Sequence, residues 1–220
     1  MPPSSTASPS SATLYYAHDP MCSWCWAFNP CWQQILSGLP ESIRVVRLVG
    51  GLAADSSELM AAEMQVFLQN TWRQIQARVP GTEFNFAFWQ QCQPRRSTYP
   101  ACRAVIAARQ QQQQADAAMT LAIQEAYYLQ ARNPSDDTTL VELAVEIGLD
   151  KEQFKRDLGS AATQQTLLQE IALCRDIGAR GFPSLILEHG GQRRLLALDY
   201  QQPQRILSQI ETCLQVVLSS

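Results

Sequence analysis

The sequence DPMCSWCW, residues 19–26, decides the interpretation of the fold because it separates two segments of different periodicity. Residues 14–17 before it form a short apolar run that predicts a β-strand, and residues 22–36 have the apolar spacing of a helix. Residues 43–49 are rich in β-branched side chains and end at a pair of glycines, which predicts a second strand. The chain is therefore expected to begin with a strand, a helix and a strand.

Cys22 and Cys25 are the expected redox centre. Cys22 lies at the predicted start of the helix, where free backbone N–H groups and the helix dipole stabilise a thiolate, the species that attacks disulfides. Cys25 follows within one helical turn and lies close enough to close a disulfide ring with Cys22. We expect Cys22 to be the attacking and more exposed sulfur and Cys25 to resolve the mixed disulfide. Trp24, between them, is expected to shield the disulfide and to contact the substrate.

A glycine–aromatic–proline run at Gly181, Phe182 and Pro183 stands directly before an apolar segment. This is a suitable place for a cis proline, although an ordinary trans turn is the alternative. A proline beside the sulfurs cannot donate a competing hydrogen bond, and its neighbours can present backbone groups to an extended substrate. We expect Pro183 to take part in catalysis and Gly181 and Phe182 to contact the substrate.

Helical spacing predominates between residues 57 and 180. It predicts a long amphipathic helix that ends at Pro80, followed by helices over 100–109, 115–131, 138–147, 151–158 and 163–177. Two short apolar segments then predict strands, and a proline near the start of the last apolar stripe predicts a final helix. These three elements are expected over 184–188, 195–198 and 203–218.

The composition is that of a globular protein with neither nucleic acids nor membranes as partners. Of the 220 residues 46% are hydrophobic, enough to bury a core, and a formal net charge of −3 gives no general attraction to phosphates. No apolar run is long enough to cross a bilayer. Residues 1–12 are rich in Ser and Pro and lack the features of a signal peptide, so we expect a disordered leader and a cytoplasmic location. The seven cysteines are expected to be mostly free thiols.

Together these motifs resemble the DsbA-like branch of the thioredoxin superfamily. Residues 19–26 are similar to its cytoplasmic FrnE-like members, and residues 180–187 are similar to their cis-proline loop. The resemblance implies an α/β, thioredoxin-like fold with a large all-helical insertion. Residues 13–56 and 178–220 would form the thioredoxin-like domain, and residues 57–177 the inserted helical domain.

The resemblance also implies an enzyme, a protein disulfide oxidoreductase or isomerase with Cys22 and Cys25 as its redox pair and Pro183 as its cis proline. The resemblance does not imply a substrate; we expect protein or small-thiol substrates, an unknown recycling partner, a monomer or homodimer, and neither a cofactor nor a metal. Where periplasmic relatives have Pro-His between the cysteines, this chain has Ser-Trp, so we expect a weaker oxidant. Tyr16 replaces a residue that is often acidic in thioredoxins, so another group must relay protons.

A zinc site is one alternative, since His18, Cys22, Cys25 and Cys31 supply four possible ligands. Cys31 follows Cys25 by six residues, however, and therefore points away from the pair on an ideal helix. The sequence favours a loop position for His18 and a packing role for Cys31.

Two further alternatives concern function. The architecture is shared with kappa-class glutathione transferases and related isomerases, although these usually have serine at the first cysteine position. A non-catalytic thioredoxin-like adaptor could also keep both cysteines. Two local possibilities remain open: Cys92 and Cys102 could form a second redox pair, and Asp19 could form a cap or turn or carry protons near Cys25.

Overall fold

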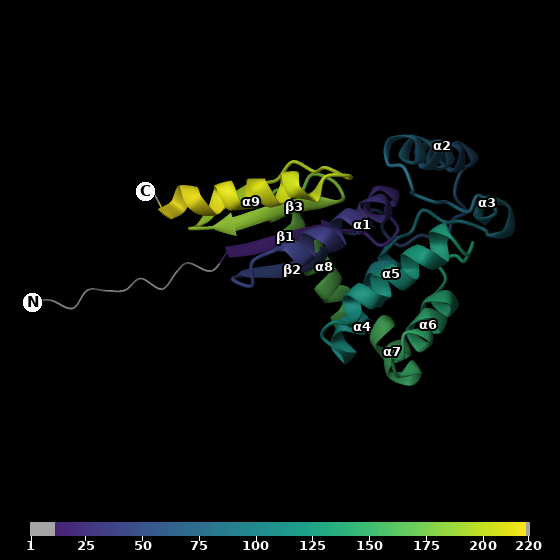
Figure 1. Ribbon diagram of the computed structural model, residues 1–220. Coiled ribbons are helices and arrows are strands. Elements are labelled where there is room, and N and C mark those ends of the chain that lie inside the picture. Colours follow the sequence, from purple (N-terminus) through teal and green to yellow (C-terminus); the bar gives the residue numbers. More distant parts are fainter. Residues whose placement is uncertain (1–11, 219–220) are drawn as a thin grey trace, which may run out of the picture.

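The computed structural model describes residues 12–218, with side chains described up to Gln215 (Figure 1). Its four strands form one sheet in the order β2-β1-β3-β4. Their bounds are β1 Ala12–His18, β2 Ile43–Val49, β3 Ser184–His189 and β4 Gln192–Leu195. β1 runs parallel to β2 and antiparallel to β3, with Ala17 opposite both Leu48 and Ser184. The carboxyl end of β1, which leads to the two cysteines, therefore lies beside the beginning of β3.

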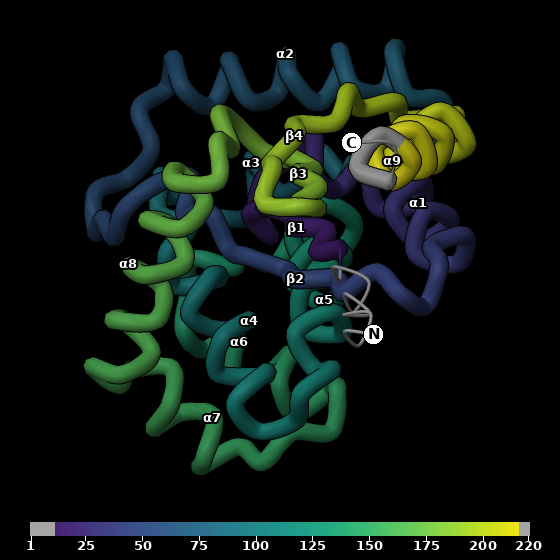
Figure 2. Tube along the Cα trace, turned by 90° about the vertical axis from the view of Figure 1, so that its left-hand side faces the viewer, coloured from purple at the N-terminus to yellow at the C-terminus, as the bar shows by residue number. Residues whose placement is uncertain are grey.

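Two helices cover one face of this sheet, α1 (Ser23–Gly38) and α9 (Pro203–Leu218). The strand alternation decides which residues they meet, because Leu14 and Tyr16 point toward α1 while Ala17 points to the opposite face. On that opposite face lies α8 (Ala161–Asp176) (Figure 2). Its Cys174 belongs to the same buried cluster as Ala17. The sheet is thus buried between α8 on one side and α1 with α9 on the other.

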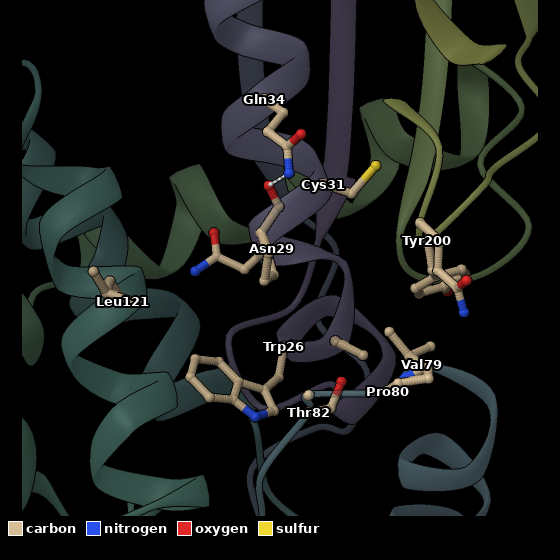
Figure 3. A pocket seen from close by; sticks show the side chains of 13 residues that line it. Trp26, Asn29, Cys31, Gln34, Val79, Pro80, Thr82, Leu121 and Tyr200 are labelled. Atoms are coloured by element: carbon tan, nitrogen blue, oxygen red, sulfur yellow. Dashed lines mark hydrogen bonds between the residues drawn. The ribbon is translucent and has the colours of Figure 1, made fainter. Parts of the chain in front are cut away.

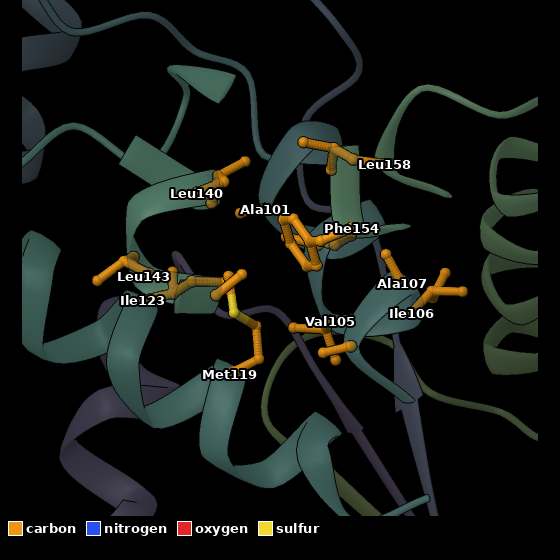
Figure 4. Packing of buried hydrophobic residues seen from close by; sticks show 14 of the residues in the cluster. Ala101, Val105, Ile106, Ala107, Met119, Ile123, Leu140, Leu143, Phe154 and Leu158 are labelled. Carbon is orange, nitrogen blue, oxygen red and sulfur yellow. The ribbon is translucent and has the colours of Figure 1, made fainter. Parts of the chain in front are cut away.

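The remaining helices follow β2 in the chain and precede β3. They are α2 (Ala62–Arg78), α3 (Phe88–Gln91), α4 (Tyr99–Gln111), α5 (Ala115–Tyr128), α6 (Asp137–Glu146) and α7 (Lys151–Leu158). Side chains of α4, α5, α6 and α7 converge in one apolar core, where Phe154, Met119 and Leu140 are fully buried (Figure 4). Since α8 contacts both α4 and β2, it links this core to the sheet. The domain division at residues 57–177 stays a prediction.

Three expectations about the elements are wrong in detail. β4 lies three residues earlier than the predicted strand at 195–198, because its first three residues are polar and exposed at the sheet edge, whereas Leu196 after it is buried. α2 begins at Ala62 and not near residue 57, since Leu59 forms an isolated bridge with Arg95. The short helix α3 was not expected from the spacing.

The proposed leader falls almost entirely outside the described residues. Residues 1–11 are not described, and Ala12, its last residue, is instead the buried first residue of β1. Within residues 12–218, none of the helices combines the length and the apolar character that a membrane span requires.

Candidate active site

Cys22 forms the N-cap of α1. Its backbone is extended, with φ −82° and ψ 117°, and its carbonyl accepts the first helical hydrogen bond from the N–H of Trp26 at 3.1 Å. Cys22 therefore stands at the end of the helix where the first-turn N–H groups lack helical partners, and its side chain makes no capping hydrogen bond to them. Cys22 is 8% exposed and Cys25 0%, which confirms that the first sulfur is the more accessible one.

The loop before β3 comes to the same place. The Phe182–Pro183 peptide bond is cis, as expected, and the Cys22 thiol donates to the Phe182 carbonyl at 3.4 Å. Gly50, after β2, leaves room for the Phe182 ring, because a Cβ atom on Gly50 would lie 1.9 Å from Cζ of that ring. Pro183 is buried, Phe182 is half-buried and Gly181 is exposed. The two distant motifs of the sequence therefore meet at the Cys22 sulfur.

Asp19 holds the loop that carries the motif. Its fully buried carboxylate accepts hydrogen bonds from the N–H of Met21 at 2.8 Å, the N–H of Leu52 at 2.7 Å and the Thr98 hydroxyl at 2.7 Å. Burial raises the pKa of Asp19, while these three hydrogen bonds act in the opposite direction. The bond to Met21 forms a turn, so Asp19 is a turn residue that also joins the motif to the start of α4.

Cys25 is shielded from solvent behind Cys22. Burial raises the pKa of the Cys25 thiol well above its usual range, and the neighbouring Cys22 raises it further. The Tyr128 hydroxyl of α5 donates to the Met21 carbonyl at 2.7 Å and fixes the backbone just before the pair. Trp24 is half-buried, with its ring edge against Tyr200 at a centroid distance of 5.4 Å.

A cleft of about 530 Å³ opens onto Cys22. Most of its lining comes from the cysteine motif, α2 and the segment that leads to α4, and the loop before β3 contributes Phe182. Trp24 and Phe182 line it beside the sulfur, and Phe67 on α2 is 61% exposed at its wall. A substrate in this cleft would therefore lie against the more exposed sulfur of the pair.

A second cavity, of about 610 Å³, lies along α1 and does not include either Cys22 or Cys25 among its lining residues (Figure 3). Trp26, Leu121 and Tyr200 contribute to its wall. The Cys31 thiol donates to the Asp199 carbonyl at 3.1 Å, and burial raises the pKa of Cys31 to about 11. Cys31 is thus a buried packing residue on this side of α1, as expected.

The loop position predicted for His18 is wrong. His18 is the last residue of β1, is 2% exposed and stacks on Tyr16 with 4.9 Å between ring centroids. Of the four possible zinc ligands, the structure brings Cys22 and Cys25 together, while Cys31 turns toward Asp199. Within residues 12–215 no three His, Cys, Asp or Glu side chains are grouped as a metal site would require.

Cys92 and Cys102 lie in different surroundings. The Cys92 thiol donates to the Ala131 carbonyl at 3.0 Å in the aromatic cluster around Trp72. The fully buried Cys102 thiol instead donates to the carboxylate of Asp19 at 3.5 Å. The structure therefore gives the two thiols separate partners.

Several residues of the site were not identified as site residues from the sequence. Thr98, Tyr128 and Gly50 contact the motif or its cis-proline loop from positions far along the chain. Tyr128, for example, is separated from Met21 by 107 residues. No local periodicity identifies such partners, although Gly50 was noticed as the end of a strand.

Comparison with known proteins places this geometry in a family. A family model described as thioredoxin matches residues 15–198. The chain belongs to the thioredoxin family. Solved structures of DsbA-like proteins share its fold, so the expected DsbA-like, thioredoxin-like α/β architecture with a helical insertion is confirmed.

Two solved structures cover nearly the whole chain. A Nitrosomonas europaea protein, provisionally assigned as a protein disulfide isomerase, has a TM-score of 0.80 and 26% identity, covering 93% of this chain and 98% of its own. The cytosolic disulfide reductase DsbM from Pseudomonas aeruginosa has a TM-score of 0.74 and 24% identity, covering 93% of this chain and 99% of its own. The second likeness shows the fold alone.

The sequence is also similar to that of a protein named as an adapter and not as an oxidoreductase. The ClpXP adapter protein SpxH of Bacillus subtilis is 26% identical over 174 residues, which are 78% of this chain and 56% of SpxH. The chain thus spans little more than half the length of this relative.

Proposed function

We propose that the protein is a thiol-disulfide oxidoreductase that acts through Cys22 and Cys25. The observation that carries this proposal is the position of the Cys22 sulfur, which lies at the N-terminus of α1, in the wall of a cleft and 3.4 Å from the carbonyl oxygen of Phe182. The DsbA-like relatives among the solved structures support the same chemistry.

The Cys22 thiolate attacks one sulfur of a substrate disulfide, and the other substrate sulfur leaves as a thiolate. Cys25 then attacks the Cys22 sulfur of the mixed disulfide, which forms the Cys22–Cys25 bond and releases the second substrate sulfur. Because the raised pKa of Cys25 keeps this thiol protonated at rest, it gives up its proton only in this step, to the leaving thiolate. The substrate gains two electrons and the protein loses two.

The loop and the tryptophan have supporting roles in this mechanism. Pro183 has no N–H group, so it places no competing donor beside the disulfide. Gly181 and Phe182 offer backbone groups to an extended substrate, and Trp24 contacts it across the cleft. Phe182 already presents its carbonyl to the sulfur.

Protein thiols and disulfides are the proposed substrates, in a cytoplasmic protein that works as a reductase or isomerase. The direction of the reaction depends on what recycles the pair. DsbM, a cytosolic disulfide reductase by name, has also been solved with glutathione. We therefore propose glutathione as the recycling thiol of this chain.

The test is the reduction of insulin by dithiothreitol in the presence of the purified protein. The wild type should accelerate the reaction, whereas Cys22→Ser should abolish the acceleration and Cys25→Ser should accumulate a mixed disulfide detectable by mass spectrometry. Cys213→Ser is the matched control, because this half-buried thiol packs beside α1 on α9, away from the cleft. Full acceleration by Cys22→Ser would exclude the mechanism.

An adapter function for ClpXP is the second candidate, favoured by the similarity to SpxH. The exposed apolar side chains Leu59, Val66 and Phe67 on and before α2 offer a contact surface for a protein partner. The immobilised protein should then retain ClpXP, and Cys22→Ser should retain it equally. If ClpXP is not retained, the adapter function is excluded and the oxidoreductase proposal is unaffected.

A further inference from the structure

Arg96 is a cation without a counter-ion at the cleft that opens onto Cys22. Its side chain is exposed and lines the cleft, and within the described part of the chain no hydrogen bond or ion pair engages it. Arg95, its neighbour, is also in the lining but is neutralised by an ion pair with Asp136 and donates to the Ser135 carbonyl at 2.6 Å. Arg96 is therefore available to an anion that enters the cleft.

The charge of the cleft differs in sign from that of the chain. The whole chain carries a formal net charge of −3, yet the residues described as lining this cleft include two arginines and neither Asp nor Glu. The other polar groups are neutral, among them the Asn70 and Gln74 amides of α2. Such a wall attracts a negatively charged ligand and offers its amide groups hydrogen bonds.

The size and shape of the cleft suit a small molecule. Its volume of about 530 Å³ lies within the range of about 300–1,000 Å³ that is usual for small-molecule sites. Aromatic side chains at Trp24, Phe67 and Phe182 form apolar parts of the wall. Cys22 and Arg96 both line this one cleft.

We propose that this cleft binds a small anionic thiol or its disulfide, with a carboxylate on Arg96 and the reacting sulfur at Cys22. This inference rests on the proposed oxidoreductase function and names its small substrate class, for which glutathione is the probe. Arg96 is the specificity-determining residue because guanidinium and carboxylate form charge-assisted hydrogen bonds.

The corresponding reaction balances within the named reactants. Two glutathione molecules and the Cys22–Cys25 disulfide give the reduced pair and one glutathione disulfide. The first glutathione thiolate attacks Cys22, Cys25 leaves and takes up a proton, and a second glutathione thiolate attacks the glutathione sulfur of the mixed disulfide. Cys22 leaves as a thiolate, and the two electrons pass from the glutathione sulfurs to the protein.

The kinetic test compares glutathione with the uncharged thiol 2-mercaptoethanol as reductants of the oxidised full-length protein. Arg96→Gln should raise the KM for glutathione about tenfold and lower the preference for glutathione over 2-mercaptoethanol by the same factor. A tenfold change corresponds to the low end of the free energy that a hydrogen bond to a charged group contributes. Arg96→Lys should recover part of the preference. Arg156→Gln is the matched control, because it removes an exposed charge on α7 and no residue of α7 lines the cleft. This variant should behave as the wild type.

Calorimetry with the Cys22→Ala protein separates binding from chemistry. Glutathione should bind this protein. The added Arg96→Gln substitution should raise the dissociation constant for glutathione about tenfold. If the wild type reacts with glutathione while Arg96→Gln changes neither the KM nor the dissociation constant by more than twofold, the inference is wrong and the oxidoreductase function stands. If glutathione binds in an Arg96-dependent way but the wild type reduces no disulfide, the oxidoreductase function is wrong and the binding site stands.

Discussion

His18 gives the protein a pH-dependent stability whose size follows from its burial. Its Nδ1 atom has no hydrogen-bond partner among the described residues, and its ring lies against Tyr16 inside the fold. Burial, together with the smaller effect of the positive charges of Arg47 and Arg109, lowers the pKa of His18 from 6.5 to about 3. The folded protein therefore keeps this ring neutral at pH values where the unfolded chain protonates it.

The sign and the magnitude come from proton linkage. Below a pH of about 6.5 the unfolded chain binds a proton that the folded protein binds only near pH 3, so stability is lost as the pH falls through this window. Each pH unit within it corresponds to about 1.4 kcal/mol. Acidification from pH 7 to about pH 4 should therefore remove about 3 kcal/mol of the free energy of unfolding through His18 alone.

The assay is urea denaturation of the wild type and His18→Phe at both pH values. Phenylalanine keeps a ring for the stack on Tyr16 and does not titrate. For each protein we compare the decrease in the free energy of unfolding on acidification, which cancels any constant packing defect of the variant. The comparison also cancels the contributions of Asp19 and Glu170, whose raised pKa values favour the folded state as the pH falls. The variant should lose about 3 kcal/mol less than the wild type, and equal losses would refute the reasoning.

Three further substitutions test the packing around the site. Gly50→Ala should lower the free energy of unfolding by about 1–3 kcal/mol and reduce reductase activity, because its Cβ would displace the Phe182 ring from 1.9 Å away. Asp19→Asn should cost about 1–3 kcal/mol, since the amide has one acceptor oxygen and its N–H₂ group would face the N–H of either Met21 or Leu52, both of which now donate to the carboxylate. Trp72→Ala should cost about 3–5 kcal/mol, because Trp72 is 1% exposed at the centre of an aromatic cluster. Chemical denaturation measures all three.

Matched controls keep these tests specific. Gly159→Ala at the end of α7 should be nearly neutral, because the nearest atom to its Cβ would be 3.9 Å away. Asp55→Asn removes a half-exposed partner of Arg103 and should cost less than Asp19→Asn. Gly50→Ala with unchanged stability and activity would contradict the close approach of Phe182. A Trp72→Ala protein as stable as the wild type would contradict the packing of the cluster.

The redox motif and most of the elements were predictable because their signals are local. Cys22 and Cys25 stand within one turn of a helix that follows a strand, and both the strand alternation and the helical spacing are visible over a few residues. The cis bond before Pro183 was also expected from its neighbours. β4 was misplaced for the same reason, since its exposed edge residues carry no apolar pattern.

The buried polar contacts could not be predicted in this way. His18 was expected in a loop because the apolar run that predicted the strand ends at Ala17, and no local pattern shows that tertiary packing would bury the His18 ring to 2% exposure. The three donors to the Asp19 carboxylate include Thr98, which lies 79 residues away. A long-range contact depends on how several elements pack together, and periodicity within one element does not encode it.

The sequence by itself determined the pair of cysteines, their place at a helix start and the order of most strands and helices, because these follow from spacing along one stretch of chain. Only the tertiary structure decided what surrounds the first sulfur. It brought the Phe182 carbonyl to Cys22 across 160 residues, buried Cys25 behind it, and placed Arg96 in the same cleft. The physical reason is that parallel pairing of β1 with β2 and antiparallel pairing with β3 gather loops from distant positions at one end of the sheet.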